Sequence, residues 1–497
     1  MRKTIKLLLF MLLFSNQIVG QGFYNHQWLL GSYLFLQDPK GRIVFDSSSF
    51  SHIPEFRKMV FWGTEATICD AQGNFLMSSN GVWIANANND TMLNGSGLNP
   101  NGITSNWAFG LPMTSNAMFI PFPGDSTKYL LIHHSATFDG YSYPAYEIYN
   151  STIDMSLDNG LGGVTVKNQI LLSDTLNWGI GACKHANGRD WWIVASKNNS
   201  DIIYTLLLTP LGLTLMNTQH LILPKPWYNV AQPTFSLDGT KFIYNTYDTT
   251  TINSFVVFSD FNRCTGIFSN TQTLQVTNGQ LIWGLCQSPI NNLFYACSSS
   301  RIFQINTDSL TVDTVANYDG FISPPGQTCC ATSFWNMYLA ANGKIYITSG
   351  SGVQHLHEMN YPDSAGLACD VQQHAINLGY AQLRAVPNHP NYNLGPLVGS
   401  ICDSLSVGLP EQGHDFRFGI SPNPTYDGSI KLVYLLPQNQ PGLFEVYDIT
   451  GQLVYKMNLP LWSTLQYIHL PELSNGVYTC VIKSGYERVG KKLVVMR

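Results

Sequence analysis

Short stretches in which hydrophobic and polar residues alternate run through residues 22–397, and no long stretch has a helical period. These stretches are rich in aromatic and β-branched residues and are bounded by Gly, Asn, Asp and Pro, as β-strands are. A tight turn, mostly of Asp-Gly or Asn-Gly type, followed by such a stretch recurs at intervals of 51 to 63 residues. The six copies are marked by Gly73, Asp125, Gly188, Gly239, Asn292 and Gly343. Each copy predicts a β-hairpin, because Asp or Asn before Gly supplies the positive backbone dihedrals of a tight turn.

A repeat of this length with several short strands is typical of a β-propeller blade, a four-stranded antiparallel sheet packed between neighbouring blades. Residues 22–398 have room for six or seven blades. Seven is preferred, because residues 28–62 could complete a blade with the last strands of this region. A right-handed β-helix would need a much shorter repeat. A pair of β-sandwiches would not explain the nearly even spacing of the turns.

The two ends of the chain have different patterns. Arg2, Lys3 and Lys6 precede an uncharged apolar stretch at residues 7–14, which predicts a signal peptide over residues 1–21. Residues 399–415 break any strand pattern and predict a linker. Residues 416–497 again alternate over short stretches and predict a small, immunoglobulin-like antiparallel β-sandwich. The expected fold class is therefore all-β, with a β-propeller followed by this sandwich.

Four segments of the last domain, residues 421–424, 446–454, 473–478 and 491–495, together resemble the type A sorting domain of the Bacteroidetes type IX secretion system. The resemblance implies export across the outer membrane by the type IX machinery, usually with removal of the domain and often with attachment to lipopolysaccharide. It thus implies a secreted or outer-membrane surface protein. The residues that carry the sorting motif are Pro422, Asn423, Pro424, Asp448, Gly451, Gly476, Tyr478, Lys491 and Lys492.

The body also resembles a group of exported Bacteroidetes propeller proteins without a settled activity. The resemblance is carried by residues 66–70, 80–84, 92–98, 149–163, 184–188 and 391–397. It supports the architecture and implies no chemistry.

Charge and cysteine content narrow the function classes. Charged residues make up only 11% of the chain and the formal net charge is −5, so nucleic acid is not an expected partner. Ten cysteines in an exported chain permit disulfides. A bridge that closes the ring is expected among four of them, namely Cys329, Cys330, Cys369 and Cys402.

No motif indicates a cofactor, a metal site or a catalytic residue. His133-His134, Lys184-His185 and His355 with His357 are the places where a metal or acid–base site would have to lie, and each is better interpreted as a hydrogen-bonded strand face. The chain lacks a Gly-x-Ser-x-Gly elbow and a phosphate-binding loop.

Binding or adhesion without turnover is therefore the predicted function, with a glycan or a protein as ligand. Contacts are expected at the polar loops 86–106 and 137–143 and at Trp191 or Trp227, because exposed aromatic rings stack on sugars. The alternative is an extracellular polysaccharide hydrolase or lyase, which would draw its carboxylates from Glu65, Glu147 and Glu358. An enzyme should bring two or more carboxylates or histidines together at the propeller axis, whereas a binding protein should line it with neutral polar and aromatic groups.

Overall fold

The computed structural model describes residues 22–496 apart from 34–35, 138–143, 222–231, 291, 325, 327–328, 404–416, 437–440, 461–463 and 485–486. The predicted signal peptide and most of the predicted linker lie outside these residues. The chain divides into two compact units, residues 1–400 and 401–497, and each is described by itself.

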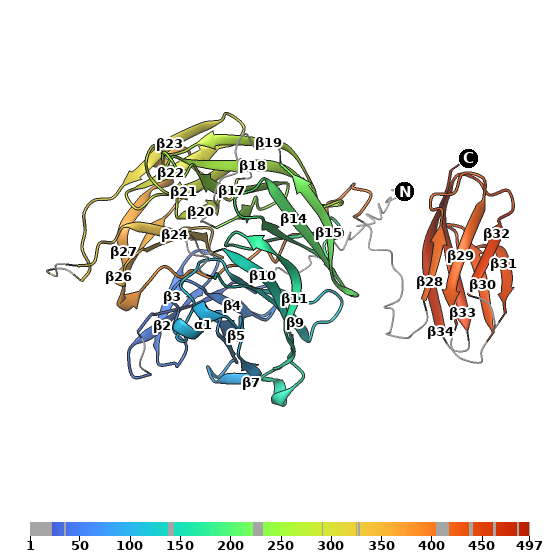
Figure 1. Cartoon of the computed structure of the whole chain (residues 1–497), viewed down its shortest axis with the longest axis horizontal. Helices are drawn as coiled ribbons and strands as arrows, with labels where there is room; N and C mark the ends of the chain where they lie inside the picture. The colour runs from blue at the N-terminus through green and yellow to red at the C-terminus, as the bar shows by residue number, and fades with distance from the viewer. Residues whose placement is uncertain are drawn as a thin grey trace, which may run out of the picture. The chain divides into compact units, whose positions relative to one another are not determined.

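Seven antiparallel blades in chain order make the first unit a β-propeller, and one parallel pairing, of Gly163 with Leu93, joins the second and third blades into one eight-stranded sheet (Figure 1). Six blades have four strands and the first has three. Blade 1 comprises β1 (Gln27–Leu30), β2 (Lys40–Phe45) and β3 (Phe50–Glu55). Blade 2 comprises β4 (Ala66–Cys69), β5 (Phe75–Ser79), β6 (Trp83–Ala85) and β7 (Thr91–Ser96), and blade 3 comprises β8 (Ala117–Pro121), β9 (Lys128–His133), β10 (Ala145–Asp154) and β11 (Gly163–Leu176).

The other four blades repeat the same order. Blade 4 comprises β12 (Gly181–Lys184), β13 (Trp191–Ser196), β14 (Ile202–Thr209) and β15 (Gly212–His220), and blade 5 comprises β16 (Thr234–Phe235), β17 (Lys241–Tyr247), β18 (Ser254–Asn262) and β19 (Ile267–Gln275). Blade 6 comprises β20 (Gly284–Gln287), β21 (Leu293–Cys297), β22 (Arg301–Asn306) and β23 (Thr311–Asn317), and blade 7 comprises β24 (Phe334–Leu339), β25 (Ile345–Ser349), β26 (Val353–Met359) and β27 (Val371–Gln382). The described helices are short: α1 (Gly102–Asn106), η1 (Asp158–Gly160) and η2 (Gly366–Cys369).

The recurring turns join the first and second strands of blades 2 to 7, as the sequence predicts. In blade 2, the Asp70 carboxylate accepts hydrogen bonds from the amides of Gln72 and Asn74, at 2.8 and 2.9 Å. Gly73 has a φ of +87°, and Gly188, Gly239 and Gly343 share the left-handed backbone. Such a turn favours glycine because a side chain is strained at this φ.

The ring closes by packing rather than by a shared sheet. Trp28, Ile43 and Phe45 of blade 1 form one hydrophobic cluster with residues of blade 7, among them Tyr346 and Tyr380. Figure 1 shows β2 and β3 beside β26 and β27. The interpretation that residues 28–62 join the last strands in one blade is therefore wrong. Strands β1 to β3 pair with one another and form a blade of their own, which brings the number of blades to seven. The preferred number of seven is confirmed.

A segment without regular structure, residues 383–397, fills the centre of the ring, and we call it the plug. Seven of its residues are buried: Ala385, Val386, Pro387, Asn388, His389, Pro390 and Tyr392. The plug is hydrogen-bonded to residues in or beside blades 2, 3, 4 and 5. The partners are Glu65 and Thr67 for blade 2, Ser115 and Phe119 for blade 3, Ile180 and Ala186 for blade 4, and Leu237 for blade 5. The plug thus holds the inner strands together from within.

The second unit is a β-sandwich of a three-stranded and a four-stranded sheet. The first sheet comprises β28 (Arg417–Ser421), β29 (Ser429–Leu435) and β32 (Leu465–His469), and the second comprises β30 (Gly442–Tyr447), β31 (Leu453–Leu459), β33 (Gly476–Ser484) and β34 (Glu487–Val495). Ile430, Leu432 and Tyr434 of one sheet share a core with Phe444 and Ile482 of the other. The predicted all-β fold of both domains is confirmed.

The expected disulfide among Cys329, Cys330, Cys369 and Cys402 is not formed. Cys329, Cys330 and Cys369 are free thiols, whereas Cys402 is disulfide-bonded, as is Cys264. Cys329 and Cys330 precede the first strand of blade 7, and Cys369 follows its third strand, so these cysteines lie at opposite ends of the blade. A disulfide needs Cα atoms within about 7 Å, which is much less than the length of these strands.

Thiol labelling should distinguish these cysteines. Burial raises the pKa of the Cys69, Cys183 and Cys297 thiols to about 12, and such thiols form little of the reactive thiolate. Cys329 is exposed and Cys330 is partly exposed. We expect a maleimide to modify Cys329 and Cys330 of the folded chain within minutes and the buried thiols only after unfolding. Mass spectrometry of digested protein checks this, and early labelling of Cys69 or Cys297 would contradict the packing described here.

Candidate functional site

One end of the propeller carries the connections between blades. The inner strands of blades 2 to 7 run in the same sense along the axis, so the segments that precede these strands meet at the same end of the ring. Of these six connections, five are residues 56–65, 97–116, 177–180, 276–283 and 318–333, and most of the sixth, residues 221–233, lies outside the described residues. The turns that join second to third strands lie at this end as well, because neighbouring strands are antiparallel.

Every one of the six connections has a tryptophan within it or at the start of the strand that follows. They are Trp62, Trp107, Trp178, Trp227, Trp283 and Trp335. The five that the structure describes are all partly exposed, whereas Trp28, Trp191 and Trp192 inside blades are about 1% exposed. We call the end of the ring that carries these five residues the tryptophan face.

The described tryptophans form two groups on this face. Trp283 and Trp335 are stacked, with ring centroids 4.1 Å apart and an interplanar angle of 13°. The Arg384 guanidinium lies 4.5 Å from the centroid of Trp335. Two groups this close to one ring must occupy its opposite faces, so Trp335 lies between Arg384 and Trp283.

The second group lies over blades 2 to 4. The rings of Trp62 and Trp107 meet edge to face, with centroids 4.9 Å apart. Trp107 and Trp178 pack against the buried side chains of Leu111 and Met113. Packing beneath the rings fixes their positions, which lowers the entropy that a ligand must remove when it binds.

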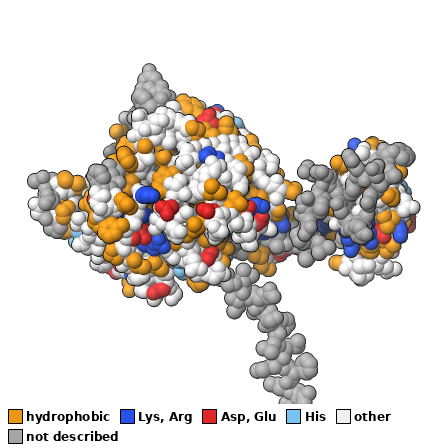
Figure 2. All heavy atoms as spheres, turned by 90° about the horizontal axis from the view of Figure 1, so that it is seen from below, with side chains coloured by type: hydrophobic (Ala, Val, Ile, Leu, Met, Phe, Trp, Pro, Cys, Tyr) orange, Lys and Arg blue, Asp and Glu red, His pale blue; other side chains and the backbone are white. Residues whose placement is uncertain are grey.

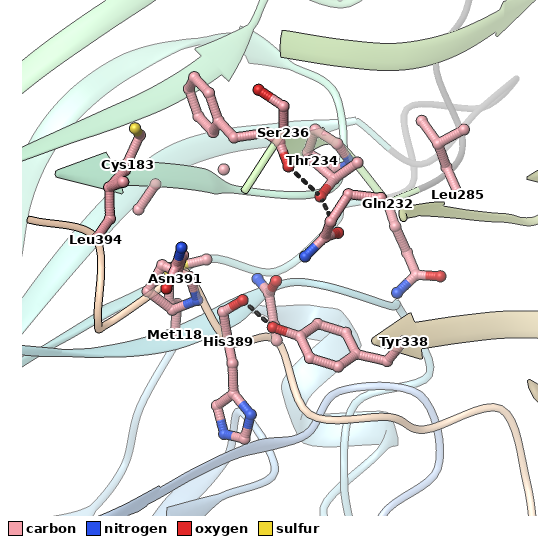
Figure 3. Close-up of a pocket in the computed structure, with 17 residues that line it drawn as sticks. Met118, Cys183, Gln232, Thr234, Ser236, Leu285, Tyr338, His389, Asn391 and Leu394 are labelled. Carbon is pink, nitrogen blue, oxygen red and sulfur yellow. Dashed lines mark hydrogen bonds between the residues drawn. The ribbon is translucent and has the colours of Figure 1, made fainter. Parts of the chain in front are cut away.

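The plug closes the channel beneath the tryptophan face. The side-chain amide of Asn388 donates to the carbonyl groups of Ser115 and Ile180, at 3.2 and 3.1 Å, and its backbone amide donates to the Glu65 carbonyl. The axial cavity that remains has a volume of about 30 Å³, which is enough for about one water molecule. Figure 3 shows His389 and Asn391 of the plug facing Thr234 and Tyr338 from the inner strands. The channel itself therefore has no room for a sugar.

The carboxylates expected of an enzyme do not come together. Glu65 precedes an inner strand and is buried, and neither carboxylate oxygen has a hydrogen-bond partner among the described residues. Burial raises its pKa well above the usual range, although Arg57 and the Leu29 amide oppose the shift. Glu147 and Glu358 lie on the third strands of blades 3 and 7, which are two strand spacings, about 10 Å, outside the inner strands. Glu358 is paired with Lys344 at 2.9 Å.

The histidine pairs are buried rather than open. His133 donates to or accepts from Asn99 and Ser151, and burial lowers the pKa of both His133 and His134 to about 3. His355 contacts the Ser323 hydroxyl at 2.7 Å, and burial lowers the pKa of His357 to about 4. No group of three or more potential metal ligands occurs among the described residues.

The two tryptophans proposed as ligand contacts from the sequence have different outcomes. Trp191 is 1% exposed and packs against Tyr392 of the plug and Lys184, so its ring is not available to a ligand. This corrects the expectation for Trp191, whose place on a central strand of blade 4 buries it. Trp227 lies outside the described residues, as do residues 138–143 of the expected loop 137–143.

Sequence reasoning missed the tryptophan face, although the sequence contains a signal for it. A Trp-Gly pair occurs at residues 62–63, 178–179 and 283–284, each within four residues of an inner strand. The pattern becomes visible only once the blade boundaries are known.

A second hollow lies at the opposite end of the ring. It has a volume of about 370 Å³ and is lined by turns of blades 5 to 7 and by the plug, including Leu237, Gly343 and Asn393. Its residues lack the exposed tryptophans of the other end.

The residues of the sorting motif hold the second unit together. The Asn423 side chain bridges to the backbone of Lys492 and Val494, at 2.8 and 2.9 Å, which ties residues 422–424 to β34. The Asp448 carboxylate accepts from Thr450 and Gln452 in a turn that Gly451 completes at a φ of +85°. The remaining motif residues are Gly476, which begins β33, Tyr478, whose hydroxyl donates to the Ser474 carbonyl, and the exposed Lys491 and Lys492.

Comparison with solved structures gives only distant similarities. A protein provisionally assigned as a 6-phosphogluconolactonase from Bacteroides uniformis is 12% identical, with 74% of this chain and 97% of that chain covered and a TM-score of 0.33. A protein provisionally assigned as TolB from Agrobacterium tumefaciens is 15% identical, with 56% and 86% covered and a TM-score of 0.31. No curated protein matches the chain. The propeller assignment therefore depends on the strand order of this chain itself.

The second unit has a clear match. Residues 420–496 match the model of the secretion system C-terminal sorting domain, within the region where the sequence predicts it. No helix among the described residues is long and apolar enough to span a membrane. The chain thus carries a type IX sorting domain behind an all-β propeller, and it is an exported protein sorted to the cell surface or secreted.

Proposed function

We propose that this protein is an exported binding protein that recognises a glycan on the tryptophan face, without turnover. The observation that carries the proposal is the set of five partly exposed tryptophans, four in connections between blades and Trp335 at the start of β24. Aromatic rings that are held in place and partly exposed offer the apolar surface on which a sugar ring stacks.

The surroundings of these rings suit a ligand with many hydroxyl groups. Charged residues make up only 11% of the chain, and on the side of the molecule that Figure 2 shows they are scattered among neutral and hydrophobic side chains. Loop 97–116, which contains part of the expected loop 86–106, contributes Asn, Ser and Thr side chains next to Trp107. Neutral groups of this kind donate and accept hydrogen bonds without strong charge steering.

The geometry gives less support to an enzymatic function. Hydrolysis of a glycosidic bond generally uses two carboxyl groups about 5 to 10 Å apart. Glu65 is sealed beneath the plug, and Glu147 and Glu358 lie on outer strands of two different blades. A protein ligand would also contact exposed tryptophans. The binding experiments below distinguish a glycan ligand from a protein ligand.

The last residues of the first unit lie at the end of the ring opposite the tryptophan face. The Leu397 amide donates to the Ala186 carbonyl, beside the turn between the first two strands of blade 4, which lies at the opposite end of the ring. The chain therefore leaves the propeller at the end opposite the tryptophan face.

Changing the stacked tryptophans should abolish most of the binding. We expect Trp283→Ala to weaken glycan binding roughly 30-fold, the effect of losing a tryptophan worth about 2 kcal/mol in an interface, and Trp335→Ala to weaken it less, because Trp335 supports the ring of Trp283. Binding of residues 22–497 to a polysaccharide array, followed by calorimetry, measures this. Tyr361→Ala is the matched control, because Tyr361 is 58% exposed and follows the third strand of blade 7, at the other end of the ring.

Two outcomes would overturn the proposal. One is release of reducing ends or unsaturated products that Glu65→Gln, Glu147→Gln or Glu358→Gln abolishes, which would establish an enzyme. The other is unchanged binding in both tryptophan variants.

A further inference from the structure

The guanidinium of Arg384 is an unusual feature of the tryptophan face. It belongs to the plug, is partly exposed and stacks on Trp335. Its Nε lies 3.4 Å from the Gly350 carbonyl, and no carboxylate of the described residues pairs with it. Arg42, Arg57 and Arg189 all have a carboxylate partner within 3.2 Å.

The surroundings hold Arg384 in a fixed orientation. Its backbone carbonyl accepts hydrogen bonds from the Asn336 amide at 2.6 Å and from the Thr348 hydroxyl at 3.0 Å. The position of Cζ over the Trp335 ring, 4.5 Å from its centroid, restricts where the guanidinium can lie. Its two terminal nitrogens therefore remain available as a preorganised fork of donors.

We infer that Arg384 binds an anionic group, a carboxylate or sulfate ester, of an acidic glycan whose sugar ring stacks on Trp283. The inference rests on the proposed function and names its ligand class. A planar guanidinium pairs with such an oxyanion through two parallel hydrogen bonds, which are stronger than those between neutral groups. A half-buried position strengthens the pair, because water screens it less. Burial also lowers the pKa of Arg384, and an anion would relieve this cost.

The order of the three groups in the stack determines where the sugar and the anionic group of a ligand can bind. Trp335 has both faces covered, so it supports the other two groups and does not stack on the sugar. Trp283 is at the end of the stack and has one neighbour in it. A sugar on the free face of Trp283 would lie three spacings of the stack away from Arg384, so the anionic group belongs to another residue of the same polymer.

The test compares polymers that differ only in charge. Polygalacturonate and its fully methyl-esterified form share one backbone, and dextran sulfate and dextran form the second pair. We expect the full chain, residues 22–497, to bind at least one acidic polymer ten-fold or more tightly than its neutral form, with a preference that falls as salt rises. The two pairs separate a carboxylate ligand from a sulfate ligand.

Variants at Arg384 separate a specific pair from general charge attraction. Arg384→Gln should remove the preference and leave the weaker binding of the neutral polymer, while Arg384→Lys should retain part of it. Arg301→Gln is the matched control, because Arg301 is exposed on β22 and takes no part in the stack. Circular dichroism verifies that each variant is folded.

The possible results separate this inference from the proposed function. Equal binding of acidic and neutral polymers, or a preference that Arg384→Gln leaves intact, would overturn the role of Arg384 while glycan binding stands. An equal loss in Arg301→Gln would likewise overturn it in favour of diffuse attraction. Failure to bind any polysaccharide would instead overturn the proposed function.

Discussion

A chain that ends at Gln382 should fail to fold, whereas a chain that ends at Asp403 should fold as a complete propeller. The two differ by the plug and the few residues after it. Without the plug, Tyr392, His389 and Asn388 no longer fill the axis, and carbonyl groups in or beside blades 3 and 4 lose their hydrogen-bond donors. Loss of one large buried side chain costs about 3–5 kcal/mol, and a typical domain has only about 5–15 kcal/mol of stability.

Soluble yield, circular dichroism and thermal unfolding of the two chains provide the measurement. The shorter chain also lacks Cys402, which is disulfide-bonded, so point variants in the full chain are needed. Tyr392→Ala should lower the free energy of unfolding by about 3–5 kcal/mol. Tyr392→Phe, which loses only the hydrogen bond to the Phe119 carbonyl, should lower it by about 1 kcal/mol. A stable, cooperative chain ending at Gln382 would show that the plug is dispensable.

The plug also shows where sequence reasoning reached its limit. The blades were predictable because each one repeats a turn with left-handed glycine and a strand with a period of two, as at Gly73 and Gly239. Residues 383–397 have no periodic pattern, and their partners are single backbone groups spread over several blades. Nothing in the local sequence of such a segment specifies these contacts.

The irregular interval in the repeat has a physical origin as well. The 63 residues from Asp125 to Gly188 contain the long hairpin of β10, with 10 residues, and β11, with 14. The hairpin has several bulges, and β11 also makes a parallel pairing with β7 of blade 2. Blade length could not be read from turn spacing alone for this reason.

The candidate site was predictable only in kind. Composition favours neutral polar and aromatic contacts, and the tryptophan face has both. The choice of tryptophan was wrong for Trp191, because strand residues of a blade face its neighbours whereas residues in the connections reach the end of the ring. Arg384 carried no signal in the sequence, since its partner Trp335 lies 49 residues away.

Changing Glu65 to Gln should make the propeller more stable at neutral pH. Glu65 is 1% exposed, and its pKa is raised well above the usual value, chiefly by burial. Arg57 is near enough to oppose the shift, but its guanidinium is bonded to Glu55 and to the carbonyl groups of Gly41 and Met59. The folded state therefore holds a proton on Glu65 that the unfolded state releases.

This difference in proton binding fixes the sign of the effect. An acid whose pKa is higher in the folded state contributes full stability below its unfolded pKa, about 4.3, and loses that stability as pH rises toward its folded pKa. Across this window the free energy of unfolding falls by about 1.4 kcal/mol per pH unit from this group alone. Glutamine cannot ionise, so Glu65→Gln removes the decline.

Urea unfolding of the wild type and of Glu65→Gln between pH 5 and pH 8 isolates the effect of Glu65. The contributions of the other titrating groups cancel when the two free energies of unfolding are subtracted. The gain from Glu65→Gln should be small at pH 5 and should grow as pH rises. Asp125→Asn is a control of opposite sign, since hydrogen bonds from Lys128 and Thr127 lower the pKa of Asp125. It should cost less than about 1 kcal/mol at pH 7, because this pair is partly exposed. A constant difference between Glu65→Gln and the wild type at every pH would mean that Glu65 is not held protonated beneath the tryptophan face.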